Sequence, residues 1–214
     1  MELFNKHPKQ KFDAIVIGSG ISGGWAAKEL TEKGLKTLMI ERGPKVEHRV
    51  DYKTEGKPRW DFSTRMVAEK QLVDEQYHVQ KQCYAFNDAT KQFFGNDKDL
   101  PYQTPKGKKF SWIRGNSLGG KSLLWHRNSF RLSDYDFSAN QKDGYGVDWP
   151  IRYKDIKDWY SYVEKHAGIS GSKENLPQLP DSEFLPPFEM NKPELDIKAA
   201  IEKAFPERNM IISR

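Results

Sequence analysis

The feature that most constrains this chain is a glycine-rich turn near its N-terminus. Ala14–Ile17 form a short apolar run, and Gly18, Gly20 and Gly23 follow it in the spacing G-x-G-x-x-G. An apolar, partly β-branched run of this length is typical of a parallel strand buried on both faces. In such a turn the first glycine permits the bend, the second leaves room for a pyrophosphate, and the third lets the next helix pack closely. The pattern predicts a strand, a turn and a helix.

The residues after the turn complete the expected unit. A helix is predicted over residues 22–33, with Gly34 as its stop, and the run Thr37–Ile40 predicts a second strand. Glu41 follows 23 positions after Gly18, close to the roughly 20 expected for a carboxylate that binds a ribose hydroxyl. The N–H groups at the helix N-terminus suit phosphates. We therefore predict a dinucleotide-binding βαβ unit; the alternative is a βαβ unit without a ligand.

Composition describes a folded protein rather than a disordered or membrane-spanning one. The 214 residues are 36% hydrophobic and 30% charged, with a formal net charge of +5. One or two domains are expected at this length. No apolar run approaches the roughly 18 residues that cross a bilayer, so no membrane span is predicted. The single Cys83 excludes an internal disulfide and a cysteine-cluster metal site, and no metal site is predicted.

The N-terminal residues 1–10 bear on the location of the protein. They contain neither the hydrophobic core of a signal peptide nor a twin arginine. A cytoplasmic location is therefore expected, and periplasmic export together with a partner protein is the alternative.

Basic residues gather in the second hundred residues. No acidic residue occurs between Asp99 and Asp134, and basic residues interleaved with aromatic ones favour nucleic-acid binding as one interpretation. We favour closure over the phosphates of a dinucleotide and expect no nucleic-acid partner, because the stretch contains a glycine turn of its own. The basic residues are Lys106, Lys108, Lys109, Arg114, Lys121, Arg127 and Arg131.

This second glycine turn begins after Arg114. Gly115 opens it, and the adjacent Gly119 and Gly120 allow close approach of the backbone. The Ser122 hydroxyl is placed where it would suit the start of a helix. A loop that leads into a helix and binds no ligand is the alternative interpretation.

The two glycine turns together resemble the N-terminal part of a glucose-methanol-choline (GMC) flavoprotein oxidoreductase. The chain is most similar to the bacterial branch of gluconate 2-dehydrogenase-like and glucoside 3-dehydrogenase-like enzymes. The matching segments are Gly18-Ser-Gly-Ile-Ser-Gly-Gly, Glu41-Arg-Gly, Gly115-Asn-Ser-Leu-Gly-Gly-Lys-Ser-Leu-Leu-Trp, Arg131-Leu-Ser-Asp-Tyr-Asp-Phe and Asp148-Trp-Pro-Ile-Arg-Tyr.

The resemblance implies FAD as the cofactor. In the family the first turn holds the pyrophosphate, the carboxylate matching Glu41 holds the adenosine ribose, and the second turn passes the flavin. Some relatives attach FAD through a histidine where this chain has Leu124, so noncovalent binding is expected. The residues expected at the ADP half are Gly18, Gly20, Ile21, Ser22, Gly23, Glu41 and Arg42. Those expected along the ribityl chain and the flavin ring are Arg114, Gly115, Gly119, Gly120, Ser122, Trp125 and His126, although a histidine such as His126 is more often structural.

The predicted fold class is α/β, an incomplete FAD/NAD(P)-binding Rossmann-like βαβ fold with an irregular insertion. We expect the βαβ unit at residues 1–43, a lid or insertion at 44–109, a second FAD-contacting segment and helix at 110–175, and an extended connection into a further segment at 176–214. Helices are predicted within residues 64–79, at 150–167 and at 195–205.

The implied activity is that of an FAD-dependent alcohol or sugar dehydrogenase. Hydride passes from a CH–OH group of a sugar, polyol or other alcohol to flavin N5, and some relatives have a small subunit and a cytochrome c acceptor. The histidine base of the family lies near the C-terminus of a much longer chain. We therefore predict no catalytic residue up to Arg214 and expect an N-terminal fragment that is inactive alone. An NAD-binding dehydrogenase domain and a basic nucleic-acid-binding module are the alternatives.

Overall fold

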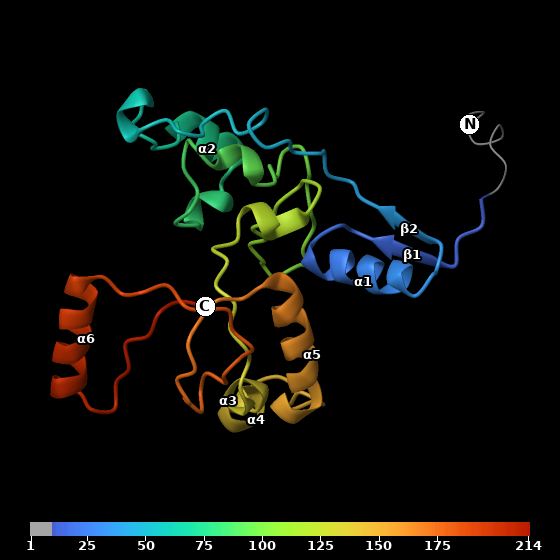
Figure 1. Cartoon of the computed structure of the whole chain (residues 1–214). Helices are drawn as coiled ribbons and strands as arrows, with labels where there is room; N and C mark the ends of the chain where they lie inside the picture. Colours follow the sequence, from blue (N-terminus) through green and yellow to red (C-terminus); the bar gives the residue numbers. More distant parts are fainter. Residues whose placement is uncertain (1–9) are drawn as a thin grey trace, which may run out of the picture. The chain divides into compact units, whose positions relative to one another are not determined.

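A computed structural model describes residues 10–214 of the chain (Figure 1). The chain divides into a unit that ends at Trp125 and a second unit, His126–Arg214. Residues 1–9, on which the expected location mainly depends, lie outside the described residues. The finer division into four segments stays a prediction.

The first unit opens with a βαβ unit (Figure 1). Strands β1 (Ala14–Ile17) and β2 (Thr37–Ile40) pair in parallel, and helix α1 (Ile21–Glu32) connects them. Both strands have the predicted bounds, whereas α1 begins and ends one residue earlier than expected. The described residues thus form a mixed α/β structure whose one sheet has two strands. This arrangement is compatible with part of a Rossmann-like domain.

Two glycines with positive φ set the bends of this unit. Gly18 leaves β1 with a φ of +92°, a conformation that glycine adopts at little cost. Gly34 has a φ of +82° after α1, and its N–H donates to the carbonyl of Thr31 at 2.9 Å. This bond satisfies a carbonyl group at the helix end, as the predicted glycine stop requires.

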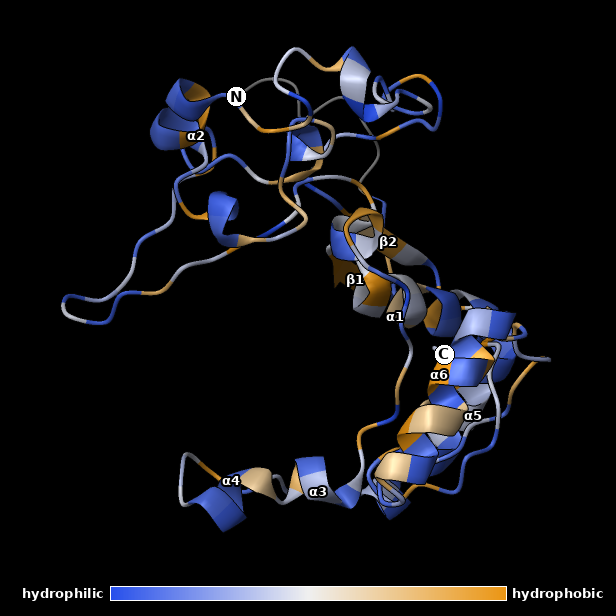
Figure 2. Ribbon diagram, turned by 90° about the vertical axis from the view of Figure 1, so that its left-hand side faces the viewer, coloured by the Kyte–Doolittle hydropathy of each residue, from blue (hydrophilic) through white to orange (hydrophobic). Residues whose placement is uncertain are grey.

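The sheet is covered on one face only. Val16 is 8% exposed and lies beside α1, since a Cβ on Gly23 would be 3.4 Å from the Val16 side chain. Ile15 and Ile17 point to the opposite face and are 60% and 85% exposed, although Figure 2 shows β1 as hydrophobic. The prediction of burial on both faces is therefore wrong for residues 10–214. A parallel sheet needs a covering layer on each side, and these residues supply one.

The rest of the first unit is irregular and is held by aromatic contacts. Phe86 packs against Tyr77 and Phe94, with ring centroids 5.1 and 5.2 Å apart. Phe94 also forms an antiparallel bridge with Gly115, which joins the predicted insertion to the second glycine turn. The short helices are η1 (Arg59–Asp61), α2 (Lys70–Gln76), η2 (Gln80–Gln82), η3 (Lys91–Phe93) and η4 (Gly120–Leu123).

The second unit contains the helices α3 (Asp134–Phe137), α4 (Ala139–Asp143), α5 (Tyr153–Ala167) and α6 (Lys192–Ala204). Helix α5 ends at Gly168, which has a φ of +70°, as predicted. Helix α6 begins earlier than the predicted residue 195. The Asn191 side chain accepts from the N–H of Glu194 and caps the helix, and Pro193 is tolerated in its first turn.

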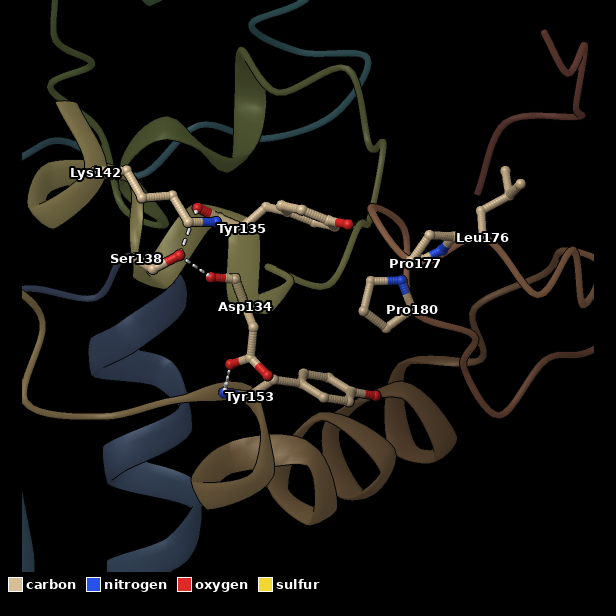
Figure 3. A pocket seen from close by; sticks show the side chains of 8 residues that line it. All are labelled: Asp134, Tyr135, Ser138, Lys142, Tyr153, Leu176, Pro177 and Pro180. Carbon is tan, nitrogen blue, oxygen red and sulfur yellow. Dashed lines mark hydrogen bonds between the residues drawn. The ribbon is translucent and has the colours of Figure 1, made fainter. Parts of the chain in front are cut away.

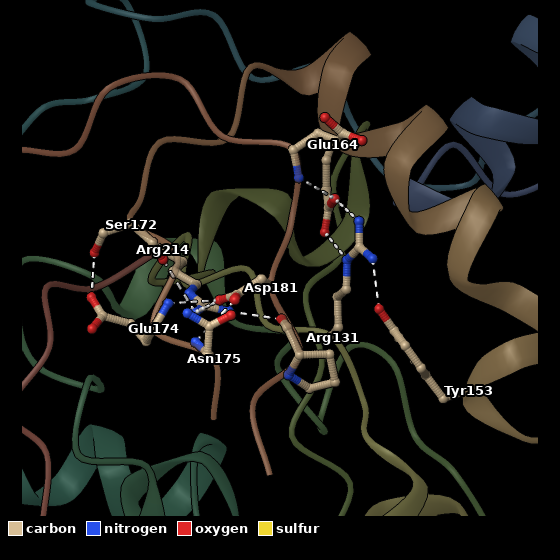
Figure 4. Close-up of polar contacts among 10 residues, drawn as sticks. Arg131, Tyr153, Glu164, Ser172, Glu174, Asn175, Asp181 and Arg214 are labelled. Carbon is tan, nitrogen blue, oxygen red and sulfur yellow. Dashed lines mark hydrogen bonds and ion pairs between the residues drawn. The ribbon is translucent and has the colours of Figure 1, made fainter. Parts of the chain in front are cut away.

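A buried ion pair forms the centre of the second unit (Figure 4). Arg131 donates through Nε to Glu164 Oε1 at 2.9 Å and through Nη1 to the Tyr153 hydroxyl at 2.7 Å. Burial raises the pKa of Glu164, but the hydrogen bonds and the charge of Arg131 outweigh it and hold this pKa below its ordinary value. A second buried arginine, Arg214, binds Asp181 at 3.0 Å and joins the end of the chain to the preceding loop.

Candidate functional site

The first glycine turn is tightly packed at Gly23 and open at Gly20. A Cβ on Gly23 would lie 1.9 Å from the carbonyl oxygen of Gly18, so this position accepts only glycine without movement of the backbone. A Cβ on Gly20 would meet no atom within 4 Å. Gly20 precedes α1, whose first turn carries no acidic residue. The N–H groups at this helix end can therefore meet an anion.

A hollow of about 360 Å³ lies at this turn. Residues of both glycine turns line it, and Lys121 is the one charged residue among them. The positive charge of Lys121 adds to the positive end of α1, so the hollow suits a phosphate group. Its lining consists of Ile17, Gly18, Gly20, Ile21, Ser22, Gly23, Lys121 and Ser122.

The second glycine turn packs directly on the first. A Cβ on Gly120 would lie 3.2 Å from the Cα of Gly20, and Gly119 and Gly120 have φ values of +88° and +59°. Ser122 lies within the single 3₁₀ turn η4, and its hydroxyl donates to the carbonyl of Gly119 at 2.8 Å. The expected helix start at Ser122 is therefore wrong, because the hydroxyl binds backward within the turn instead of capping a helix.

Glu41 lies at the end of β2 and accepts four hydrogen bonds. Its Oε2 accepts from the N–H and the hydroxyl of Ser19 at 2.8 and 2.6 Å. Its Oε1 accepts from the N–H groups of Arg42 and Gly43 at 2.8 and 2.7 Å. The hydrogen bond from the Ser19 hydroxyl, followed by those from the backbone, lowers the pKa of Glu41 to about 2. The carboxylate is thus charged and tied to the first glycine turn.

Two residues at this site, Ser19 and Gly43, were not predicted. The Ser19 hydroxyl accepts from the N–H of Gly119 at 2.9 Å, which links the two glycine turns. A Cβ on Gly43 would lie 2.5 Å from the backbone nitrogen of Ser117. The sequence signals were a serine between two glycines and a glycine directly after Glu41-Arg42, but their partners are distant in the sequence.

Arg114 is buried next to the second turn. Its side chain is 6% exposed and lies 3.5 Å from Asp97, and its guanidinium stacks 5.1 and 4.9 Å from the rings of Tyr102 and Trp112. Stacking of this kind stabilises a cation that has few hydrogen bonds. These contacts give Arg114 a structural position, and its expected contact with a cofactor stays a prediction.

The last two predicted residues follow the second glycine turn in the sequence. Trp125 is 45% exposed and ends the first unit, and His126 is exposed and begins the second. The side chain of Arg42 is exposed, while its N–H binds Glu41. Cofactor contacts of these three side chains stay predictions.

A second hollow, of about 490 Å³, lies within the second unit (Figure 3). Two hydrogen bonds lie within its lining: the Asp134 carboxylate accepts from the N–H of Tyr153 at 2.8 Å, and the backbone carbonyl of Asp134 accepts from the Ser138 hydroxyl at 2.6 Å. It contains no predicted site residue. The lining residues are Asp134, Tyr135, Ser138, Lys142, Tyr153, Leu176, Pro177 and Pro180.

Residues 10–214 lack the features of two other kinds of site. None of their helices has the length and apolar character needed to cross a bilayer. The same residues contain no cluster of three or more histidine, cysteine or carboxylate side chains placed to bind a metal ion.

Several curated proteins are similar to this chain. The gluconate 2-dehydrogenase flavoprotein of Pantoea cypripedii is 28% identical over 177 residues, which are 76% of this chain and 26% of that protein. The 6'''-hydroxyparomomycin C oxidase of Streptomyces lividus is 28% identical over 75% of this chain and 23% of its own length. The fructose dehydrogenase large subunit of Gluconobacter japonicus is 23% identical over 78% and 29%. The chain spans about a quarter of the length of these relatives, and no family model matches it.

Proposed function

We propose that this chain is the dinucleotide-binding part of a GMC-family, FAD-dependent oxidoreductase that acts on a CH–OH group of a sugar or another alcohol. One observation carries the proposal: two glycine turns, far apart in the sequence, line a single hollow together with Lys121. The relatives are named as dehydrogenases and oxidases, and one is named as a flavoprotein. These names favour flavin as the cofactor and a sugar or related alcohol as the substrate.

The residues of the hollow fit the pyrophosphate of FAD. The open side of Gly20 lets a phosphate approach the backbone, and the N-terminus of α1 and Lys121 supply positive charge. When bound, FAD would supply the acceptor for the hydride of the alcohol. The chain contributes binding and orientation, and we assign no proton acceptor to residues 10–214.

Finer features of the proposal follow the sequence resemblance. We assign the chain to the branch of gluconate 2-dehydrogenase-like and glucoside 3-dehydrogenase-like enzymes, with noncovalent FAD because Leu124 stands at the tethering position. The name of the Gluconobacter relative, a large subunit, supports a partner subunit, and a cytochrome c is the proposed electron acceptor. We propose a cytoplasmic location for this chain.

An NAD-binding dehydrogenase is the second candidate, because a pyrophosphate of either dinucleotide fits a glycine turn followed by a helix. We rank a basic nucleic-acid-binding module last, because only part of the basic stretch is exposed. Arg114 and Arg131, two of the basic residues in the stretch without acidic residues, are only 5% and 6% exposed. Buried arginines with aromatic or carboxylate partners do not form a surface for a phosphate backbone.

The test is a titration of the whole chain with FAD and, separately, with NAD, followed by flavin fluorescence and by calorimetry. We expect FAD to bind and acid precipitation to release it. The variant Lys121→Gln should weaken FAD binding about fivefold, the magnitude of an exposed ion pair. Lys108→Gln, which changes an exposed lysine outside the hollow, is the matched control. Binding of NAD without binding of FAD would refute the proposal.

A further inference from the structure

Four donors from within the chain bind the Glu41 carboxylate. They belong to Ser19, Arg42 and Gly43, and an ionised carboxylate can accept all four. Three of these donors are backbone N–H groups, which follow the course of the chain. The fourth is the Ser19 hydroxyl, the one donor that a substitution can remove without changing the backbone.

The Ser19 hydroxyl has a fixed orientation because of this carboxylate. A hydroxyl carries one proton and two lone pairs, and the short bond of 2.6 Å to Glu41 Oε2 directs the proton to the carboxylate. The lone pairs then face the N–H of Gly119, which donates to Ser19 Oγ at 2.9 Å. Hydrogen bonds that run in one direction strengthen one another. The result is a relay from Gly119 through Ser19 to Glu41.

The segments that this relay joins are packed backbone against backbone. A Cβ on Gly120 of the second turn would lie 3.2 Å from the Cα of Gly20 in the first turn. A Cβ on Gly43, just after Glu41, would lie 2.5 Å from the backbone nitrogen of Ser117 in the second turn. The N–H of Leu118 also donates to the carbonyl of Pro44 at 2.8 Å. To these backbone contacts the Ser19 hydroxyl adds a side-chain bond between the two glycine turns.

We propose that Ser19 is a positioning residue that holds the second glycine turn against the first before any ligand binds. The relay thus shapes the hollow lined by both turns in the free chain. Its consequence for FAD rests on the proposed function, but its effect on the turns does not.

The direct test is hydrogen exchange of the Gly119 amide in the free chain, measured by NMR. Ser19→Ala should speed this exchange roughly fivefold, the loss expected for one neutral hydrogen bond, and Ser19→Thr should restore it. Ser117→Ala is the control, because Ser117 is a buried serine of the same turn whose hydroxyl has no partner among the described residues. Unchanged exchange in Ser19→Ala would overturn the proposal.

Two further measurements separate a relay from a general loss of stability. Titration of the Glu41 carboxyl should give a raised pKa in Ser19→Ala and an unchanged one in Ser117→Ala, since the Ser19 hydroxyl is the largest cause of the lowered value. FAD should bind Ser19→Ala several-fold more weakly than Ser117→Ala. If no form of the chain binds FAD while Gly119 exchange responds as described, the relay stands and the proposed function fails.

Discussion

Alanine substitutions at Gly23 and Gly24 should have opposite effects on stability. Both residues lie in the first turns of α1, and each change adds one methyl group to the same helix. A Cβ on Gly23 would be 1.9 Å from the carbonyl oxygen of Gly18 and 3.0 Å from its carbon, whereas a Cβ on Gly24 would meet no atom within 4 Å. The pair therefore isolates the steric requirement of the turn from the helix propensity of alanine.

The magnitude follows from the distances. Ordinary contact begins at 3.4 Å, so in Gly23→Ala the helix and the turn must separate by about 1.5 Å. Overpacking of this kind costs roughly 1–3 kcal/mol, and the upper end applies because the clash is with backbone. The gain in helix propensity, about 1 kcal/mol, is common to both variants. We expect Gly24→Ala to be about 3 kcal/mol more stable than Gly23→Ala.

Urea denaturation followed by far-UV circular dichroism measures the difference. With a slope of about 2–3 kcal/mol per molar urea, the midpoint of Gly23→Ala should lie roughly 1 M below that of Gly24→Ala. FAD binding should be lost in Gly23→Ala and kept in Gly24→Ala. Equal midpoints for the two variants would refute the assignment of Gly23 as the residue that permits close packing of helix and strand.

Three other perturbations test the fold and the site. Glu164→Ala should cost about 3–5 kcal/mol in equilibrium unfolding, because it leaves Arg131 buried without its counter-charge; a loss below about 1 kcal/mol would contradict a buried pair. The pKa of Glu41 is lowered from 4.5 to about 2, so its stabilising contribution is complete above pH 4.5 and is lost as the pH falls towards 2. The urea midpoint should thus fall less steeply in Glu41→Gln than in the wild type over this interval, and parallel curves would count against the lowered pKa. Val16→Ala should destabilise the chain by about 2 kcal/mol and Ile17→Ala by less than about 0.5 kcal/mol, since their side chains are 8% and 85% exposed; similar losses would mean that both faces of the sheet are covered.

Local sequence signals predicted the elements whose geometry depends on near neighbours. The bounds of β1 and β2 and the stop of α5 at Gly168 are confirmed, because apolar runs and positive φ values are local properties. The start of α6 was predicted too late, although the signal was present. Asn191 and Glu194 form a capping box, and this pattern of residue types is visible in the sequence as a helix start.

The amino-acid sequence by itself determined the βαβ unit and its glycine turn, because the steric reasons for Gly18 and Gly23 lie within a few residues of each other. Only the tertiary structure decided that the second turn lies on the first. Ser19 and Gly119 are 100 positions apart, and no periodicity of the chain specifies that their side chain and backbone meet. The tertiary structure also decided that Arg114 is buried. Contacts of this kind arise from packing between segments, whose register depends on the whole unit rather than on local conformational preference.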